Sequence, residues 1–141
     1  KPVWDATIAS CLTGAYVMTR AVLPTLLAAG RGRIVNVSSI AGRFAEANRT
    51  AYCAAKWGLE GFTAALRHEV EGTGVRVHVL NPAAVATGWW DTTDDPQPAR
   101  VLDRMMTPDD VARTLVWVLT RPDHLQIDEV VLRNATSPWA P

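Results

Sequence analysis

Tyr52 and Lys56 stand one helical turn apart in the segment Tyr-Cys-Ala-Ala-Lys. Side chains at this i, i+4 spacing share one face of a helix. A neighbouring ammonium stabilises a phenolate, so we expect Lys56 to lower the pKa of Tyr52 towards neutral pH. A phenol tuned in this way is a general acid or base for moving a proton to or from oxygen. A solvated tyrosine and lysine without function meet the same spacing, so the meaning of the pair depends on the residues around it.

Two further polar segments follow predicted strands. Ser39 closes a pair of serines directly after the run Ile34–Val37, which is typical of a buried parallel strand. Residues 81–87, Asn-Pro-Ala-Ala-Val-Ala-Thr, follow a second such run at Val75–Leu80. Ligands of open α/β sheets bind at the carboxyl ends of the strands. We therefore expect the Ser39 hydroxyl and the 81–87 segment to line the same site as Tyr52.

The elements that must position these residues alternate between helix and strand. The order αβαβαβ predicts an α/β fold, a Rossmann-like doubly wound parallel sheet with helices on both faces. The last helix has the strongest start signal, because a hydroxyl cap at Thr107 is followed by Pro108 and then by two acids. The predicted helices are about Val3–Ala29 with a kink at Pro24, Thr50–Glu71 with Thr50 as N-cap, Ala99–Met106 and 108–120; the predicted strands are Arg33–Ser38, Val75–Leu80 and Ile127–Leu132.

The first helix and the first strand carry more apolar surface than a three-stranded sheet can cover. The helix over residues 3–29 is apolar on two sides, so we expect one side on the sheet and the other on a helix or a second subunit. A strand at the edge of a sheet exposes unpaired backbone groups unless another strand covers it. We therefore interpret the chain as the second part of a larger doubly wound sheet.

The charge, the apolar stretches and the cysteine content of the chain exclude several classes of binding partner and environment. The 141 residues carry 14 Lys and Arg against 14 Asp and Glu, and this zero net charge excludes a strong general attraction for nucleic acid or an anionic membrane. The longest uncharged stretch, Ala6–Thr19, is shorter than the ~20 residues that a bilayer span needs. Cys11 and Cys53 are too few for a disulfide framework, so we expect reduced thiols in a cytoplasmic chain.

Other side chains are expected to carry no chemistry. The three histidines lack further ligands at metal-binding spacing, so no metal site is expected at His68, His78 or His124. Four scattered arginines are interpreted as solvated: Arg31, Arg33, Arg43 and Arg49. The aromatic pair Trp89 and Trp90 is compatible both with a lid over a substrate and with simple packing.

From about Val3 to Arg133 the sequence resembles the classical short-chain dehydrogenase/reductase family. The matching segments are Asn36-Val-Ser-Ser-Ile-Ala-Gly42, Tyr52-x-x-x-Lys56, Gly74-Val-Arg-Val77 and Asn81-Pro-x-x-Val-x-Thr87. The resemblance implies an oxidoreductase that interconverts a small alcohol and its ketone or aldehyde by hydride transfer, with NAD or NADP as cofactor. It also implies assembly into a homodimer or homotetramer.

The resemblance assigns a role to each matching residue. It implies that Tyr52 is the general acid/base, that Lys56 tunes this phenol and holds the nicotinamide ribose, and that Ser39 orients the substrate carbonyl. The cofactor-binding residues that it implies are Tyr52, Lys56, Pro82, Ala83, Val85 and Thr87. The long segment 88–106 suits a substrate loop or lid.

The family's Gly-rich phosphate-binding turn after a first strand has no counterpart here. Residues 1–141 are therefore expected to be the C-terminal catalytic part of a single Rossmann-fold domain. We expect no turnover from this chain without its N-terminal nucleotide-binding half, supplied separately or in an intact parent protein.

Two positions depart from the family pattern. Cys11 stands where the family has an Asn that helps to hold a water in the proton relay, and a thiol holds water poorly. Ala83 stands where the family has Gly, which is expected to bring some steric cost. These departures keep a second hypothesis open: a catalytically impaired or truncated fragment that serves as an oligomerisation or binding module. The intact set of Ser39, Tyr52 and Lys56 favours the enzyme.

Overall fold

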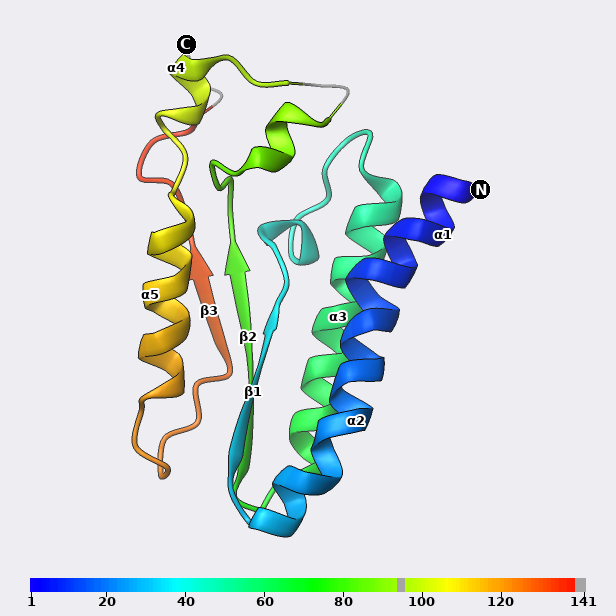
Figure 1. Cartoon of the computed structure of the whole chain (residues 1–141), viewed down its shortest axis with the longest axis vertical. Helices are drawn as coiled ribbons and strands as arrows, with labels where there is room; N and C mark the ends of the chain where they lie inside the picture. The colour runs from blue at the N-terminus through cyan, green and yellow to red at the C-terminus, as the bar shows by residue number, and fades with distance from the viewer. Residues whose placement is uncertain (94–95, 139–141) are drawn as a thin grey trace.

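A three-stranded parallel sheet forms the centre of the computed structural model, which describes residues 1–93 and 96–138 (Figure 1). Its strands lie in the order β1 (Gly32–Val37), β2 (Val75–Pro82) and β3 (Glu129–Leu132). Gly32 is opposite Val75, and Val79 is opposite Glu129. The predicted α/β fold with parallel strands is confirmed. Among the described residues, β1 pairs along one edge only.

Helices cover both faces of this sheet (Figure 1). The long N-terminal helix and α3 lie together on one side, and α5 lies on the other. The helical elements are α1 (Pro2–Ile8), the π-helical turn η1 (Ala9–Thr13), α2 (Gly14–Ala29), α3 (Thr50–Glu69), α4 (Ala99–Leu102), α5 (Pro108–Leu119) and the 3₁₀ turns η2 (Ile40–Gly42) and η3 (Gly88–Asp91). This order positions the carboxyl ends of β1 and β2 next to the first turns of α3.

The helix boundaries confirm most of the sequence predictions and correct some. α1, η1 and α2 form one helix with Pro24 inside α2, but the π-helical turn was not predicted. Thr50 is the first residue of α3 and not its cap, because the carbonyl of Arg49 already accepts a bond from the Cys53 amide at 2.8 Å. The start of α5 is as predicted, since Thr107 forms a reciprocal capping box with the third helical residue.

The main hydrophobic core lies between the sheet and the helices α2 and α3. Its buried members are Leu66, Val70, Val75 and Val77, against which Leu23, Leu26, Ile34 and Phe62 pack. Two glycines allow the chain to close this layer. Gly30 ends α2 in the left-handed region at φ 63°, and a Cβ on Gly74 would lie 2.0 Å from the Gly30 carbonyl oxygen. Only glycine permits this approach of the two turns.

The N-terminal helix differs from the expectation drawn from its uncharged stretch. The helix Pro2–Ala29 has 28 residues and a mean hydropathy of 1.3 over its most apolar window, so by length and composition alone it can cross a bilayer. Arg20 interrupts the uncharged run but does not end the helix. The same test is met by core helices of soluble proteins, and this helix packs on α3, where Tyr16 lies edge-on to Phe62 with ring centroids 6.4 Å apart.

Candidate active site

One cleft of about 1680 Å³ opens at the carboxyl ends of β1 and β2. It is bounded by η1, by the segment after β1, by the start of α3 and by the segment after β2. All the site residues predicted from the sequence line it: Cys11, Ser39, Tyr52, Lys56, Pro82, Ala83, Val85 and Thr87. The structure therefore brings together residues that lie up to 76 positions apart in the sequence.

Tyr52 and Lys56 lie on the same face of α3, and the Lys56 Nζ is 5.6 Å from the centroid of the Tyr52 ring. The lysine is buried, with 9% of its surface exposed. Its Nζ donates a hydrogen bond to the Val37 carbonyl oxygen at the end of β1, at 3.0 Å. Burial lowers the pKa of Lys56, and the negative charges of Cys11 and Glu60 act against this shift.

The pKa of Tyr52 is raised above its ordinary value, opposite to the sequence expectation. Burial is the largest cause, because it disfavours the charged phenolate. The Ser39 side chain acts against the shift as a hydrogen-bonding partner, and the charge of Cys11 adds to it. The i, i+4 spacing predicts an attractive neighbour correctly, but it carries no information about desolvation. The Tyr52 phenol is therefore protonated at neutral pH.

Ser39 is fixed by its own turn. Its Oγ accepts a hydrogen bond from the Ala41 amide at 3.1 Å and caps η2, so the hydroxyl proton stays available to the cleft. Gly42 then packs η2 directly on α3: a Cβ there would lie 2.8 Å from the Ser38 Oγ and 3.1 Å from the Lys56 carbonyl oxygen. The position of Ser39 relative to the face of α3 that carries Tyr52 and Lys56 thus depends on this close packing.

The two departures from the family pattern have different structural consequences. Cys11 lies in the π-helical turn η1, half-buried and lining the cleft. Its electrostatic contribution adds to the raised pKa of Tyr52 and opposes the lowered pKa of Lys56. Ala83 has no left-handed backbone conformation, and its amide donates to the Leu132 carbonyl at 2.9 Å. Alanine is therefore accommodated at this position without backbone strain.

The two tryptophans after Thr87 take different positions. Trp90 is buried, with 7% of its surface exposed, and its Nε1 donates to the Val85 carbonyl at 2.8 Å. Trp89 is 55% exposed and stacks edge-on against Trp90 with centroids 4.8 Å apart. Both line the cleft. The burial of Trp90 agrees with packing, and a lid over the substrate stays a prediction for Trp89. The predicted lid, 88–106, includes positions 94 and 95, which lie outside the described residues.

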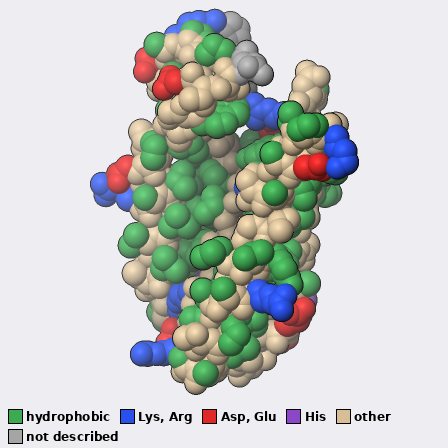
Figure 2. Space-filling view, turned by 45° about the vertical axis from the view of Figure 1, so that its right-hand side comes forward, with side chains coloured by type: hydrophobic (Ala, Val, Ile, Leu, Met, Phe, Trp, Pro, Cys, Tyr) green, Lys and Arg blue, Asp and Glu red, His purple; other side chains and the backbone are tan. Residues whose placement is uncertain are grey.

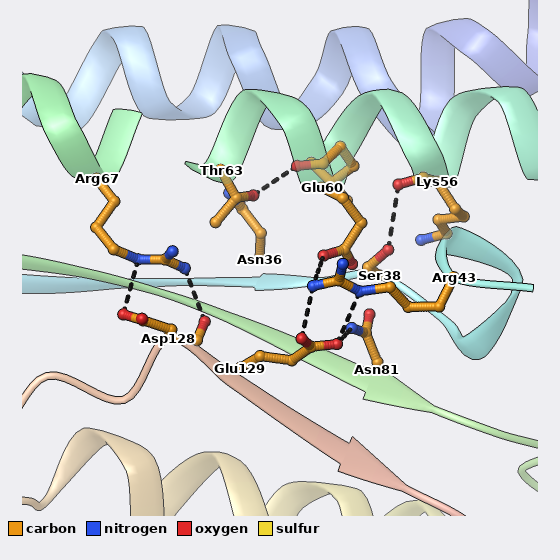
Figure 3. Close-up of polar contacts among 11 residues, drawn as sticks. Asn36, Ser38, Arg43, Lys56, Glu60, Thr63, Arg67, Asn81, Asp128 and Glu129 are labelled. Carbon is orange, nitrogen blue, oxygen red and sulfur yellow. Dashed lines mark hydrogen bonds and ion pairs between the residues drawn. The ribbon is translucent and has the colours of Figure 1, made fainter. Parts of the chain in front are cut away.

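Behind the cleft, a polar network joins the segment after β1 to the other strands (Figure 3). Arg43 donates to both carboxylate oxygens of Glu129, with the Nε–Oε1 distance at 2.9 Å, and also pairs with Glu60 at 3.3 Å. Fully buried Asn81 donates to the same Glu129 carboxylate at 2.6 Å. The prediction that Arg43 is merely solvated was wrong, because its partner lies 86 positions away.

Two of the other arginines also have partners. Arg33, with 11% of its side chain exposed, donates to the Arg121 carbonyl and pairs with Asp123 at 2.9 Å. Arg49 pairs with Glu46 at 3.1 Å. Among residues 1–93 and 96–138, no three His, Cys, Asp or Glu side chains are placed to hold a metal ion.

Arg133 and Phe44 are among the cleft residues that sequence reasoning missed. Arg133 lies just beyond β3 and lines the cleft together with Phe44, which follows η2. The Arg133 guanidinium carbon lies 5.1 Å from the centroid of the Phe44 ring. The available signal was the position of Arg133 directly after the last predicted strand, the same type of position that pointed to Ser39.

The fold is a Rossmann-like α/β domain, and its cleft contains a tyrosine–lysine pair. Comparison with known proteins identifies the family. A model of the short chain dehydrogenase family matches residues 1–98. The chain belongs to this family. It is similar to the NADP-dependent 3-hydroxy acid dehydrogenase of Salmonella typhi, with 32% identity over 97% of this chain and 58% of that protein. It is also similar to the acetoacetyl-CoA reductase of Cupriavidus necator, with 35% identity over 82% of this chain and 49% of that protein.

Solved structures show the same likeness. A closed form of serine dehydrogenase complexed with NADP⁺ superposes with a TM-score of 0.83 at 31% identity, covering 92% of this chain and 54% of the other. A metagenomic short-chain oxidoreductase in complex with NADP superposes with a TM-score of 0.75 at 35% identity, covering 96% of this chain and 55% of the other. The chain thus spans between about half and three fifths of the length of these relatives.

Proposed function

We propose that this chain forms the catalytic and substrate-binding part of an NAD(P)-dependent oxidoreductase. The reaction interconverts a small alcohol and its ketone or aldehyde by hydride transfer. The observation that carries the proposal is the meeting of Ser39, Tyr52 and Lys56 in one cleft at the carboxyl ends of two parallel strands. Membership of the short chain dehydrogenase family and the NADP-dependent relatives support the same activity.

The cleft residues fit the nicotinamide end of such a cofactor. Lys56 uses one donor on the Val37 carbonyl, and its other N–H groups remain for ribose hydroxyls. Pro82, Ala83, Val85 and Thr87 line the neighbouring wall. The unstrained backbone at Ala83 leaves this wall intact. When bound, the dinucleotide supplies or accepts the hydride, while the protein supplies position and the proton.

The side chains divide the proton chemistry among them. Ser39 holds the substrate oxygen, because its hydroxyl proton is not used within η2. Tyr52 is protonated at neutral pH and donates its proton to that oxygen during reduction. The raised pKa of Tyr52 therefore favours reduction at neutral pH. Oxidation of the alcohol requires the phenolate, so its rate increases with rising pH. Cys11 takes the place of the relay residue with a weak hydrogen-bonding group.

We further propose that residues 1–141 are the C-terminal part of a single short-chain dehydrogenase domain, with residues 88–106 as the substrate loop. The partial overlap with the relatives supports this proposal. The phosphate-binding half then comes from a separate segment or from an intact parent protein. We propose cytoplasmic localisation and assembly into a homodimer or homotetramer.

A second candidate function is an oligomerisation or binding module without turnover. The observation that favours it is the apolar outer face of the N-terminal helix, where Val17, Met18 and Val22 are 53%, 65% and 40% exposed. Figure 2 turns the side of α1 and α2 forward and shows hydrophobic groups distributed over it, with a few scattered charges. Faces of this kind are typical of association surfaces.

The catalytic proposal is tested in a version of the protein that carries a nucleotide-binding half. NADPH oxidation is measured with acetoacetate and with uncharged small ketones. We expect Tyr52→Phe to lower kcat by about 10²- to 10⁴-fold while the Kd for NADPH stays close to that of the wild type. Tyr16→Phe is the matched control, because Tyr16 lies on α2 outside the cleft. An unchanged kcat in Tyr52→Phe contradicts the role of the phenol.

The isolated 141-residue chain gives two further readouts. We expect no turnover from it, and measurable turnover would contradict the interpretation as a C-terminal part. Ligand-observed NMR with reduced nicotinamide mononucleotide tests the nicotinamide wall separately, because this probe needs no distant phosphate site. If the chain binds neither this probe nor any ketone but forms stable oligomers that Met18→Glu dissociates, the module is the better description.

A further inference from the structure

The charges that line the cleft do not balance. Among the described residues of its wall, the charged side chains are Glu46, Arg49, Lys56 and Arg133. Arg49 is paired with Glu46 at 3.1 Å. Lys56 is buried and bonded to the Val37 carbonyl, and it belongs to the catalytic pair. Arg133 is left as the cation with no carboxylate within ion-pair distance in the described part of the chain.

The contrast with Arg43 shows what an arginine at this edge of the sheet otherwise does. Arg43 and Phe44 are consecutive, and they face Glu129 and Arg133 at the two ends of β3. The Arg43 charge is matched by the Glu129 and Glu60 carboxylates (Figure 3). Four positions beyond Glu129, Arg133 has an aromatic ring in place of a carboxylate. The described protein thus supplies a counter-charge for one of these two guanidinium groups and not for the other.

Phe44 gives Arg133 a defined place. The guanidinium lies over the ring at 5.1 Å from its centroid, which is the distance of a cation–π contact. A guanidinium in cation–π contact with a ring still carries its N–H donors, which bind a carboxylate in a bidentate manner. Phe44 belongs to the same segment as Ser39, because its amide bonds to the Ile40 carbonyl of η2 at 2.9 Å. The cation is therefore tied to the segment that carries the catalytic hydroxyl.

We infer that Arg133 binds a carboxylate of the substrate, so that the alcohol or ketone is a small hydroxy- or oxocarboxylic acid. The inference rests on the proposed function, since it assigns the anchor of the substrate in the same cleft. Ser39 and Tyr52 hold the reacting oxygen, and Arg133 holds the acid group. Phe44 and Trp89, both exposed to the cleft, provide apolar walls for the carbon skeleton between the two ends.

The test compares 3-hydroxybutyrate with methyl 3-hydroxybutyrate, which differ by the negative charge. Binding to the 141-residue chain is measured by ligand-observed NMR, with the intrinsic tryptophan fluorescence of the protein as a second signal, so the readout does not depend on hydride transfer. We expect the acid to bind about tenfold more tightly or better than the ester. Arg133→Met should bring the ratio of the two Kd values close to one, and Arg133→Lys should restore part of it. The matched control is Arg121→Met, because Arg121 is stacked on Trp117 at 4.8 Å but lies outside the cleft.

Each outcome decides the inference. Equal binding of acid and ester by the wild type, no binding of either, or an unchanged ratio in Arg133→Met overturns it. A weaker Kd for NADP in Arg133→Met with an unchanged acid-to-ester ratio also overturns it, and assigns the guanidinium to a phosphate of the cofactor. Charge-dependent binding that is lost in Arg133→Met supports it, even where a version with a nucleotide-binding half has no turnover. In that case the oxidoreductase proposal fails and the carboxylate subsite stands.

Discussion

Replacing Gly42 with alanine tests the close packing that sets the position of Ser39, the serine of the proposed active site. The added Cβ would lie 2.8 Å from the Ser38 Oγ, 3.1 Å from the Lys56 carbonyl oxygen and 3.2 Å from the Glu60 Cγ. Two of these neighbours are held by the backbone or by hydrogen bonds, so the contact is relieved only by moving η2 away from α3. Overpacking of this kind costs about 1–3 kcal/mol of unfolding free energy.

Gly61→Ala is the matched control, because Gly61 lies in α3 and a methyl group added there would meet no atom within 4 Å. Both substitutions restrict the unfolded chain in the same way, so their difference reports on the folded state. Gly61→Ala should stabilise by about 0.5–1 kcal/mol through helix propensity. In urea unfolding followed by circular dichroism, the free energies of unfolding of the two variants should therefore differ by roughly 1.5–4 kcal/mol. Equal midpoints and equal slopes would show that η2 does not pack on α3 as described.

Three further predictions concern titration, the relay position and a helix cap. Burial lowers the pKa of His78, so the folded protein binds this proton less readily than the unfolded chain. The free energy of unfolding should therefore stay constant above about pH 6.5 and fall below it. His78→Gln should flatten this pH dependence, measured by urea unfolding at several pH values. Cys11→Asn replaces a weakly hydrogen-bonding thiol in η1 with an amide that holds water better, so the rate of alcohol oxidation should be equal or higher; a large loss of rate would show that the thiol has a role of its own. Thr107→Ala should lower the melting temperature through a loss of about 1 kcal/mol, because Thr107 caps α5 with Asp110, whereas Thr107→Ser should retain most of the stability.

Local signals in the sequence account for most of the fold. Four consecutive residues, 107–110, predict the start of α5. The run Val75–Leu80 is apolar enough to predict a buried central strand. The π-helical turn is different, because residues 9–13 contain no glycine or proline that would indicate it. Such turns depend on how the helix packs on its neighbours, which a local pattern does not contain.

In the candidate site too, some features follow from local sequence signals and others depend on long-range contacts. Ser39, Lys56 and the 81–87 segment were predicted around Tyr52 because they follow strands or share its helix face, whereas Cys11 was predicted from the family resemblance. The direction of its pKa was not, since burial outweighs the neighbouring charges. The Arg43–Glu129 pair and the Arg133–Phe44 contact join positions 86 and 89 residues apart. Partners at such separations become visible only when the sheet has brought the segments together.

The hydrogen bond from the Lys56 ammonium to the last residue of β1 gives one side chain two tasks. A truncation at this position removes a charge from the cleft and, at the same time, leaves a strand carbonyl without its donor. Lost turnover in such a mutant would mix chemistry with loosened architecture. Chemical methylation of the amine, which keeps its charge and changes its donors, separates the two contributions more cleanly than mutagenesis can.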